Sequence, residues 1–372
     1  MGKARTRLAA AGAALAMASS IAVSIGSMPS ASAATVCQTT AYVTSFGENL
    51  LTPIDAPTRT SLANLQLPPG SAPVGIAITD DGSTAFVALS GLAEVAVVDL
   101  ATGTVDPTTI AVGSSPQDVE LTPDGTQVWV VNQGANSIST IDVATRTKNP
   151  TDIPVGDTPN AVAFTPDGAT AFVTNFNANS VSSVDVATRT KDPTDIAVGT
   201  NPAGVAVTPD GTTVLVTNQG DPFPDPDPTK SGTVSTIDVA TRTKNPTDIS
   251  GFEHPADVVV THDGSTAFVS NFGANYVSTI DLATRTKNPD DITVDLHPSG
   301  LALSPDGTMV YSANFDASDV STIDVATRTA PDQDVAVGTA PGSIAFTPCA
   351  ATPVPPNPAP PAPVVVVPAF TG

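Results

Sequence analysis

The chain has 372 residues, with 36 acidic side chains against 14 basic ones and a formal net charge of -22. So acidic a balance excludes nucleic acid and anionic membrane surfaces as expected partners, because both repel negative charge. Hydrophobic residues make up 40% of the chain, which is enough for a buried core.

The first 33 residues have the features of a signal peptide. Three basic residues lie within the first seven positions, Leu8–Ile25 is apolar, and Ala31–Ala33 offers small residues for cleavage. No later segment is long and apolar enough to predict a membrane span. We therefore expect a mature chain that begins near Ala34 and is secreted or held at the cell surface.

One unit then recurs along most of the chain. An aspartate that closes an apolar segment marks the period, and it falls at positions 55, 99, 142, 185, 238, 281 and 324. The spacing is 43 or 44 residues except for one interval of 53, and this length is typical of a four-stranded propeller blade. Within residues 157–199, four short apolar or alternating segments are separated by turns rich in Pro, Asp, Gly and Asn, which indicates four strands.

The motifs inside the unit resemble those of a known family. They are TPDG at 122–125, 165–168 and 208–211, FVTN at 172–175, and IDVATRT at 141–147, 237–243 and 323–329. They are similar to the YVTN-type β-propeller repeat of bacterial and archaeal secreted and surface-layer proteins. The resemblance covers Cys37–Ala350 and implies an all-β propeller.

The unit count predicts seven blades. Six complete units begin at Pro73, Pro116, Pro159, Pro202, Pro255 and Pro298. A seventh is split, with its innermost strand near 342–347 and its other strands near 41–60. The sequence therefore predicts an all-β, seven-bladed β-propeller of four-stranded blades at residues 34–350. Its N- and C-terminal segments share the last blade, which closes the ring. The Pro-rich residues 351–372 are expected to be a disordered tail.

The two cysteines occupy one repeat position. Cys37, counted back from Tyr42, and Cys349, counted forward from Pro348, both align with Asp167 in the turn between the first two strands. The split blade lacks this turn because the chain ends there. We expect a Cys37–Cys349 disulfide in its place.

Basic residues are confined to one face of the predicted ring. Ten of the 11 that follow the signal peptide lie in the loop after the third strand, where we expect local pairs with aspartates. The opposite face carries the Asn-rich loops and most of the unbalanced acids. We expect that acidic loop face, around the channel mouth, to carry any binding site.

The longest departure from the repeat lies on this face. The loop between Asn218 and Val234 is ten residues longer than its equivalents and alternates Asp with Pro. Its candidate binding residues are Asp221, Phe223, Asp225 and Asp227. They could contact a partner or hold a calcium ion weakly, although a tolerated surface insertion explains them equally well.

Two histidines depart from the repeat next to that loop. His254 and His297 precede the prolines that open adjacent blades, with Glu253, Asp257 and Asp295 nearby. Two histidines with carboxylates could bind a transition metal. Polar loop residues without a function are the alternative.

Asp118 and Glu120 replace the small residues of other innermost strands. Residues two apart on a strand point the same way, so both should face the central channel. The two acids could together hold a divalent cation there.

No nucleophile elbow or haem-attachment motif occurs in the chain. The sequence therefore favours a secreted or envelope-associated, non-catalytic binding or scaffold propeller. It would be a monomer whose partner is an unknown protein or envelope component. Two alternatives stay open. One is a metal-dependent enzyme, since seven-bladed propellers of this kind resemble lactonases and lyases; the other is a structural surface-layer component.

Overall fold

The structure is a computed structural model that describes residues 39–220, 232–331 and 334–349. The expected signal peptide, the inserted loop with Asp221, Phe223, Asp225 and Asp227, and the Pro-rich tail lie outside these ranges. Among the described residues, no helix has the length and apolar character needed to cross a membrane.

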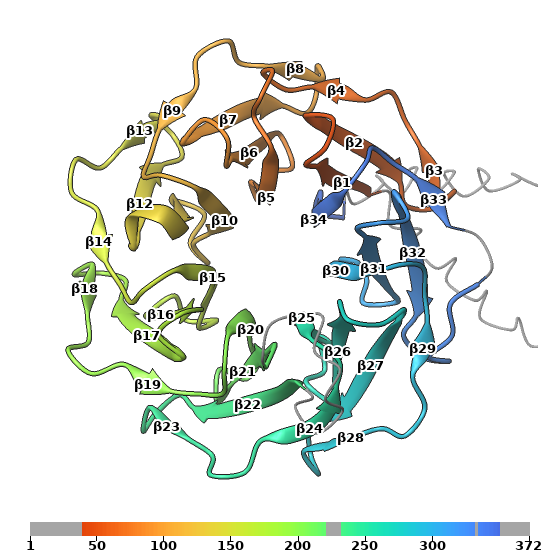
Figure 1. The fold of residues 1–372 in the computed structure, drawn as a ribbon. Helices are drawn as coiled ribbons and strands as arrows, with labels where there is room; N and C mark the ends of the chain where they lie inside the picture. The colour runs from red at the N-terminus through yellow and green to blue at the C-terminus, as the bar shows by residue number, and fades with distance from the viewer. Residues whose placement is uncertain (1–38, 221–231, 332–333, 350–372) are drawn as a thin grey trace, which may run out of the picture. The chain divides into compact units, whose positions relative to one another are not determined.

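Seven antiparallel sheets stand around a common centre, as Figure 1 shows, so the predicted seven-bladed propeller is confirmed. The innermost strands are β5 (Pro73–Ile78), β10 (Pro116–Leu121), β15 (Pro159–Phe164), β20 (Pro202–Val207), β25 (Pro255–Val260), β30 (Pro298–Leu303) and β34 (Pro341–Phe346). The second strands are β6 (Thr84–Leu89), β11 (Gln127–Asn132), β16 (Thr170–Asn175), β21 (Thr213–Asn218), β26 (Thr266–Asn271), β31 (Met309–Asn314) and β1 (Thr40–Ser45). The third strands are β7 (Glu94–Asp99), β12 (Ser137–Asp142), β17 (Ser180–Asp185), β22 (Gly232–Asp238), β27 (Tyr276–Asp281), β32 (Asp319–Asp324) and β2 (Leu50–Asp55).

The fourth strand is interrupted, which the repeat did not predict. In six blades both of its segments pair with the third strand of the same blade, whereas one segment, β33, pairs with β32 in the remaining blade. The turn between the segments contains a proline in several blades. The first segments are β8 (Thr104–Val105), β13 (Thr147–Lys148), β18 (Thr190–Lys191), β23 (Thr243–Lys244), β28 (Thr286–Lys287) and β3 (Thr60–Ser61). The second segments are β9 (Ile110–Ala111), β14 (Ile153–Pro154), β19 (Ile196–Ala197), β24 (Ile249–Phe252), β29 (Ile292–Thr293), β33 (Val335–Ala336) and β4 (Leu65–Gln66). A single turn of 3-10 helix, η1, spans Gln133–Ala135.

The core lies between neighbouring blades. Second strands such as β11 and β16 are almost wholly buried. Trp129 of β11 is fully buried and meets Phe164 of the next blade edge-on, with 5.2 Å between ring centroids. Thr174 links the blades by a hydrogen bond, because its Oγ1 donates to the carbonyl oxygen of Ala203 at 2.7 Å. Each blade thus buries its two faces against its neighbours.

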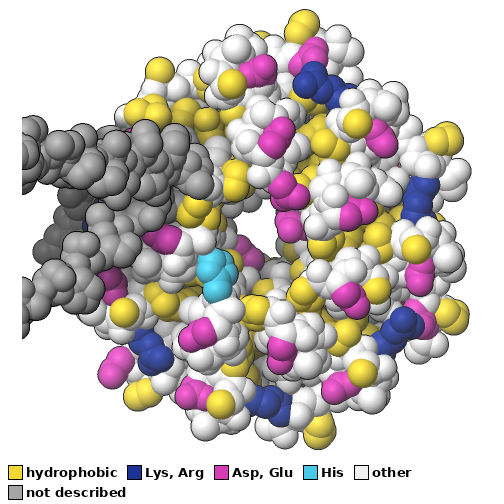
Figure 2. All heavy atoms as spheres, turned by 180° about the vertical axis from the view of Figure 1, so that it is seen from behind, with side chains coloured by type: hydrophobic (Ala, Val, Ile, Leu, Met, Phe, Trp, Pro, Cys, Tyr) yellow, Lys and Arg dark blue, Asp and Glu magenta, His cyan; other side chains and the backbone are white. Residues whose placement is uncertain are grey.

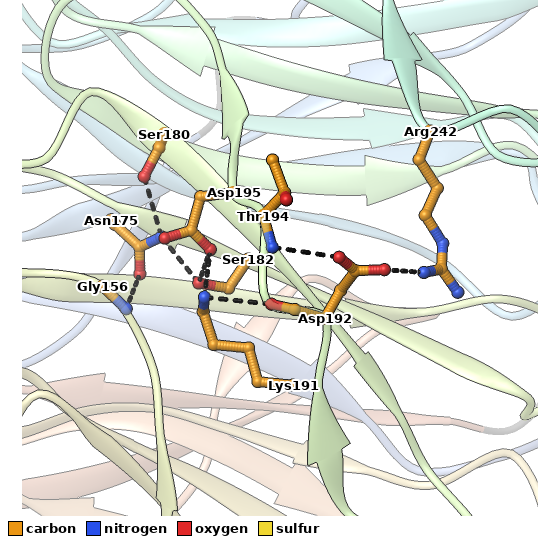
Figure 3. Close-up of polar contacts among 9 residues, drawn as sticks. All are labelled: Gly156, Asn175, Ser180, Ser182, Lys191, Asp192, Thr194, Asp195 and Arg242. Atoms are coloured by element: carbon orange, nitrogen blue, oxygen red, sulfur yellow. Dashed lines mark hydrogen bonds and ion pairs between the residues drawn. The ribbon is translucent and has the colours of Figure 1, made fainter.

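A polar network fixes the outer half of each typical blade, and Figure 3 shows it for the blade that begins at β15. Asn175 Nδ2 donates to Ser182 Oγ at 3.0 Å, and Ser182 Oγ donates to Asp195 Oδ1 at 2.8 Å. Lys191 Nζ pairs with the same aspartate oxygen at 2.7 Å. The equivalent pairs are Lys148–Asp152, Lys244–Asp248 and Lys287–Asp291. Together with Arg146–Asp106 and Arg242–Asp192, they show the expected local pairing with aspartates for these six basic residues.

The ring closes where the two ends of the sequence meet, as predicted. β34 pairs antiparallel with β1, and Thr347 N donates to Thr40 O at 2.9 Å just beyond the strands. Cys349 takes part in a disulfide. The chain's other cysteine, Cys37, lies outside the described residues, so its pairing with Cys349 stays a prediction that the place of closure supports.

Candidate functional site

A channel runs between the seven innermost strands. It forms a cavity of about 880 Å³ whose lining comes from all seven blades. Figure 2 shows the channel as an opening at the centre of the ring, with acidic side chains at its edge and Lys and Arg side chains near the outer rim. The channel is wide because most blades place Gly, Ala or Ser at the positions that face it.

Asp118 and Asp257 lie in this channel, three blades apart. In each case a glycine of the preceding innermost strand packs against the aspartate. A Cβ on Gly75 would lie 2.6 Å from the Cα of Asp118, and one on Gly204 would lie 2.8 Å from the Cα of Asp257. The neighbouring innermost strand therefore needs glycine at these two positions to make room for the acidic residues. The sequence placed Asp257 with the loop-face histidines, whereas the structure places it with Asp118.

Both aspartates hold backbone groups. Asp118 accepts hydrogen bonds from its neighbour Val119 N at 2.8 Å and from Val162 N of the next blade at 3.0 Å. Asp257 repeats this pattern with Leu301 N of the blade that follows it, at 2.9 Å. Burial raises the pKa of both carboxyls, to about 6 for Asp257, although the backbone hydrogen bonds oppose the shift. Their first role is to join blades.

Glu120 differs from both aspartates because, within the described part of the chain, nothing forms a hydrogen bond with its carboxyl group. It lies on β10 opposite Trp129. Its side chain is accessible from the channel cavity, and the protein encloses that cavity on all sides of the ring. Loss of bulk solvent, then the charges of Asp118 and Asp257, raise the pKa of this carboxyl from 4.5 to about 8. A group with such a pKa can give or take a proton near neutral pH.

The remaining charged groups of the channel are Asp80 and His262, beside Glu120 and the two aspartates. His262 replaces the proline of a PDG turn, and the sequence alone did not suggest that it faces the channel. Lys and Arg are absent from the described lining of the cavity. The channel is therefore an acidic site with one weak base.

The loop-face candidates form a separate group. His297 Nδ1 lies 2.7 Å from Asp316 Oδ2, and its ring stacks on Phe272 with centroids 5.2 Å apart. Glu253 N donates to Asn271 Oδ1 at 3.0 Å. Neither His254 nor His297 lines the channel cavity or belongs to a group of three potential metal ligands among the residues described. The two histidines are not brought together with Asp118, Glu120 or Asp257.

An acidic cluster that the sequence did not single out lies in the blade of β30–β33. Carboxylate oxygens of Asp295, Asp319 and Asp334 lie within 4.8 Å of one another. Burial, opposed by a hydrogen bond from Asn314 and reinforced by the other two acids, raises the pKa of Asp319 to about 6. Ala330 stands where four other blades have the lysine that pairs with the equivalent aspartate. That missing lysine was the available signal.

A divalent cation in the channel does not fit the donor geometry. Asp118 and Asp257 already bind backbone N–H groups through both carboxylate oxygens. The described channel acids are not among the groups of three whose oxygens come within 4.8 Å. We therefore derive no chemistry through a metal there.

A model of the YNCE-like β-propeller family matches residues 12–222, more than half of the chain. The chain belongs to this family. A second model, described as lactonase, 7-bladed β-propeller, matches residues 227–340 of this YNCE-like protein. The YVTN repeat family suggested by the motifs is not itself among these matches. No curated protein matches the sequence.

Solved structures share the fold. The periplasmic gluconolactonase of Pseudomonas aeruginosa is 18% identical with a TM-score of 0.67, covering 84% of this chain and 99% of that one. Hydrazine synthase of Kuenenia stuttgartiensis is 23% identical with a TM-score of 0.65, covering 74% and 90%. Virginiamycin B lyase of Staphylococcus aureus is 13% identical with a TM-score of 0.60, covering 73% and 87%.

These comparisons overturn the non-catalytic function favoured by the sequence. The lactonase family model over residues 227–340 favours an enzyme of the lactonase type, which was the alternative. The error has a physical reason. A search for catalytic motifs finds sets of residues at fixed spacing, whereas the properties of the channel carboxyl Glu120 depend on residues from distant blades.

Proposed function

We propose that this YNCE-like propeller hydrolyses lactones in its central channel. The observation that carries the proposal is Glu120, a carboxyl without a described hydrogen-bond partner in a cavity of about 880 Å³. Such a cavity has room for a sugar-sized ring together with water. The lactonase match over residues 227–340 supports the same reaction class.

Glu120 would act as a general base and then as a general acid. Its carboxylate takes a proton from water as the water oxygen bonds to the lactone carbonyl carbon. The tetrahedral intermediate then breaks the ring C–O bond, and Glu120 returns the proton to the departing ring oxygen. The product is the open-chain hydroxy acid, and Glu120 is again a carboxylate.

Asp118 and Asp257 would serve as positioning residues. Their negative charges raise the pKa of Glu120, which makes its carboxylate a stronger base than an ordinary glutamate. Their backbone hydrogen bonds hold the adjoining blades, so the width of the channel depends on them. We also propose that the enzyme works outside the cytoplasm, which the predicted signal peptide and the disulfide at Cys349 support.

The test measures hydrolysis of glucono-δ-lactone at constant pH, with spontaneous hydrolysis subtracted. Glu120→Gln should lower kcat/KM by about 100-fold or more, since a positioned general base contributes on the order of 10²–10⁴. The wild-type rate should rise with pH toward a plateau above about pH 8, where Glu120 is ionised. His297→Ala, on the loop face, is the matched control and should keep the wild-type rate. A fully active Glu120→Gln variant would refute this assignment.

A further inference from the structure

The charges of the channel and of the outer rim are separated. The described lining contains Asp80, Asp118, Glu120 and Asp257, while His262 is its one group able to become positive. The described lysines lie on the outermost strands, where salt bridges such as the 2.7 Å Lys191–Asp195 pair hold them. A ligand in the channel therefore meets negative charge that no Lys or Arg of the described lining offsets.

We propose that the channel selects lactones by charge: it favours a lactone that carries an ammonium group and rejects one that carries a phosphate. This proposal rests on the proposed lactone hydrolysis and names its substrate class. A phosphate dianion would be repelled by several carboxylates at once in a space shielded from bulk water. An ammonium group would be attracted by the same carboxylates.

Glu120 offers the free hydrogen-bonding capacity for such a group. Both carboxylate oxygens of Asp118 and Asp257 accept backbone N–H groups, whereas those of Glu120 accept none among the residues described. An ammonium ion has three N–H donors and forms its strongest hydrogen bonds with carboxylates. One carboxylate oxygen of Glu120 would therefore hold the ammonium group while its other oxygen takes the proton from the attacking water, with the aspartates as a second ring of charge.

The first experiment compares two matched pairs of substrates. 2-Amino-γ-butyrolactone is compared with its uncharged N-acetyl derivative, and glucono-δ-lactone is compared with its 6-phosphate. We expect kcat/KM to be at least about 10-fold higher for the amine than for the amide, and about 100-fold lower for the phosphate than for its parent. Added salt should bring the kcat/KM values within each pair closer together, because it screens the charges.

Ala163 provides variants that change the charge of the channel. It holds on β15 the repeat position that Glu120 holds on the preceding blade, and it lines the same cavity. Ala163→Lys should weaken by about 10-fold or more both the preference for the amine over the amide and the preference for glucono-δ-lactone over its 6-phosphate. Ala163→Met, of similar bulk and no charge, should leave both preferences unchanged. If lysine and methionine have the same effect, bulk rather than charge determines selection and the proposal is wrong.

A binding measurement separates this proposal from the proposed reaction. The probes are 3-amino-2-pyrrolidinone, 2-pyrrolidinone and inorganic phosphate, which contain no ester to hydrolyse. The aminolactam should bind most tightly, and its binding should release protons at pH 7 because a cation favours ionised carboxyls. If this order holds but no lactone is hydrolysed, charge selection stands and the reaction fails. If phosphate binds as well as the aminolactam, or none of the three binds, charge selection is refuted.

Discussion

Replacement of Glu120 by Gln tests how far the fold is strained to keep a carboxyl in the channel. The pKa of this group rises from 4.5 to about 8 on folding. Between those two pH values the unfolded chain has lost the proton that the folded chain keeps. The native state therefore loses stability relative to the Gln variant as pH rises, by up to about 1.4 kcal/mol per pH unit.

The full shift would amount to between about 4 and 5 kcal/mol above pH 8. Water in the channel screens a side chain that is exposed there, so we expect about 2 kcal/mol. Urea unfolding at pH 5, 7 and 9 measures this difference. Glu120→Gln and wild type should be close in stability at pH 5, and the variant should be the more stable protein at pH 9.

Asp263→Asn is a control of opposite sign. A hydrogen bond from Thr261 and others from Ser265 lower the pKa of Asp263 from 3.8 to about 2. The ionised carboxylate therefore stabilises the fold at pH values above the pKa of the unfolded chain, and this stabilisation is lost as pH falls toward 2. The Asn variant should thus lose stability at neutral pH. The reasoning about Glu120 fails if the difference in free energy of unfolding between Glu120→Gln and wild type does not vary with pH, or if wild type is the more stable protein at pH 9.

Three further predictions concern the frame around the channel. Ala330→Lys should restore the missing ion pair with Asp334 and raise the free energy of unfolding by about 0.5 kcal/mol; chemical denaturation measures this change. Asp118→Ala should destabilise the fold by about 1–3 kcal/mol, because Val162 N loses its acceptor, and amide exchange at Val162 should accelerate. Reduction of the Cys349 disulfide should lower the melting temperature, with roughly 5 kcal/mol as the upper limit for so long a loop, and gel mobility without reductant should reveal the bond.

The fold could be predicted from the sequence because its information is local and repeated. Each unit carries its own turn residues and alternating apolar pattern, and seven copies average out the ambiguity of any one short strand. The closure between β34 and β1 followed from counting units. The interrupted fourth strand was missed, because a two-residue segment is too short to produce an alternating pattern.

The site could be predicted only in part, because its geometry joins residues that are far apart in sequence. Asp118 and Glu120 were recognised as channel residues since they replace small side chains in a known strand. Asp257 lies three residues after His254, and this closeness suggested one site. The strand that begins at Pro255 instead carries Asp257 into the channel, where burial, and to a smaller extent the charge of Asp118, raises its pKa. The sequence alone does not show that Asp257 and Asp118 line the same channel.

A propeller of near-identical units can acquire a unique site only where one unit departs from the others. Departures of two physical kinds are present here. Asp118 and Asp257 satisfy backbone N–H groups of the next blade, so their carboxylate oxygens have partners in the frame. Glu120 gains no comparable partner among the described residues, and its raised pKa shows that the native fold carries an unfavourable carboxyl. Carboxyls with strongly raised pKa values cluster at functional sites, which is why the proposed reaction is assigned to Glu120.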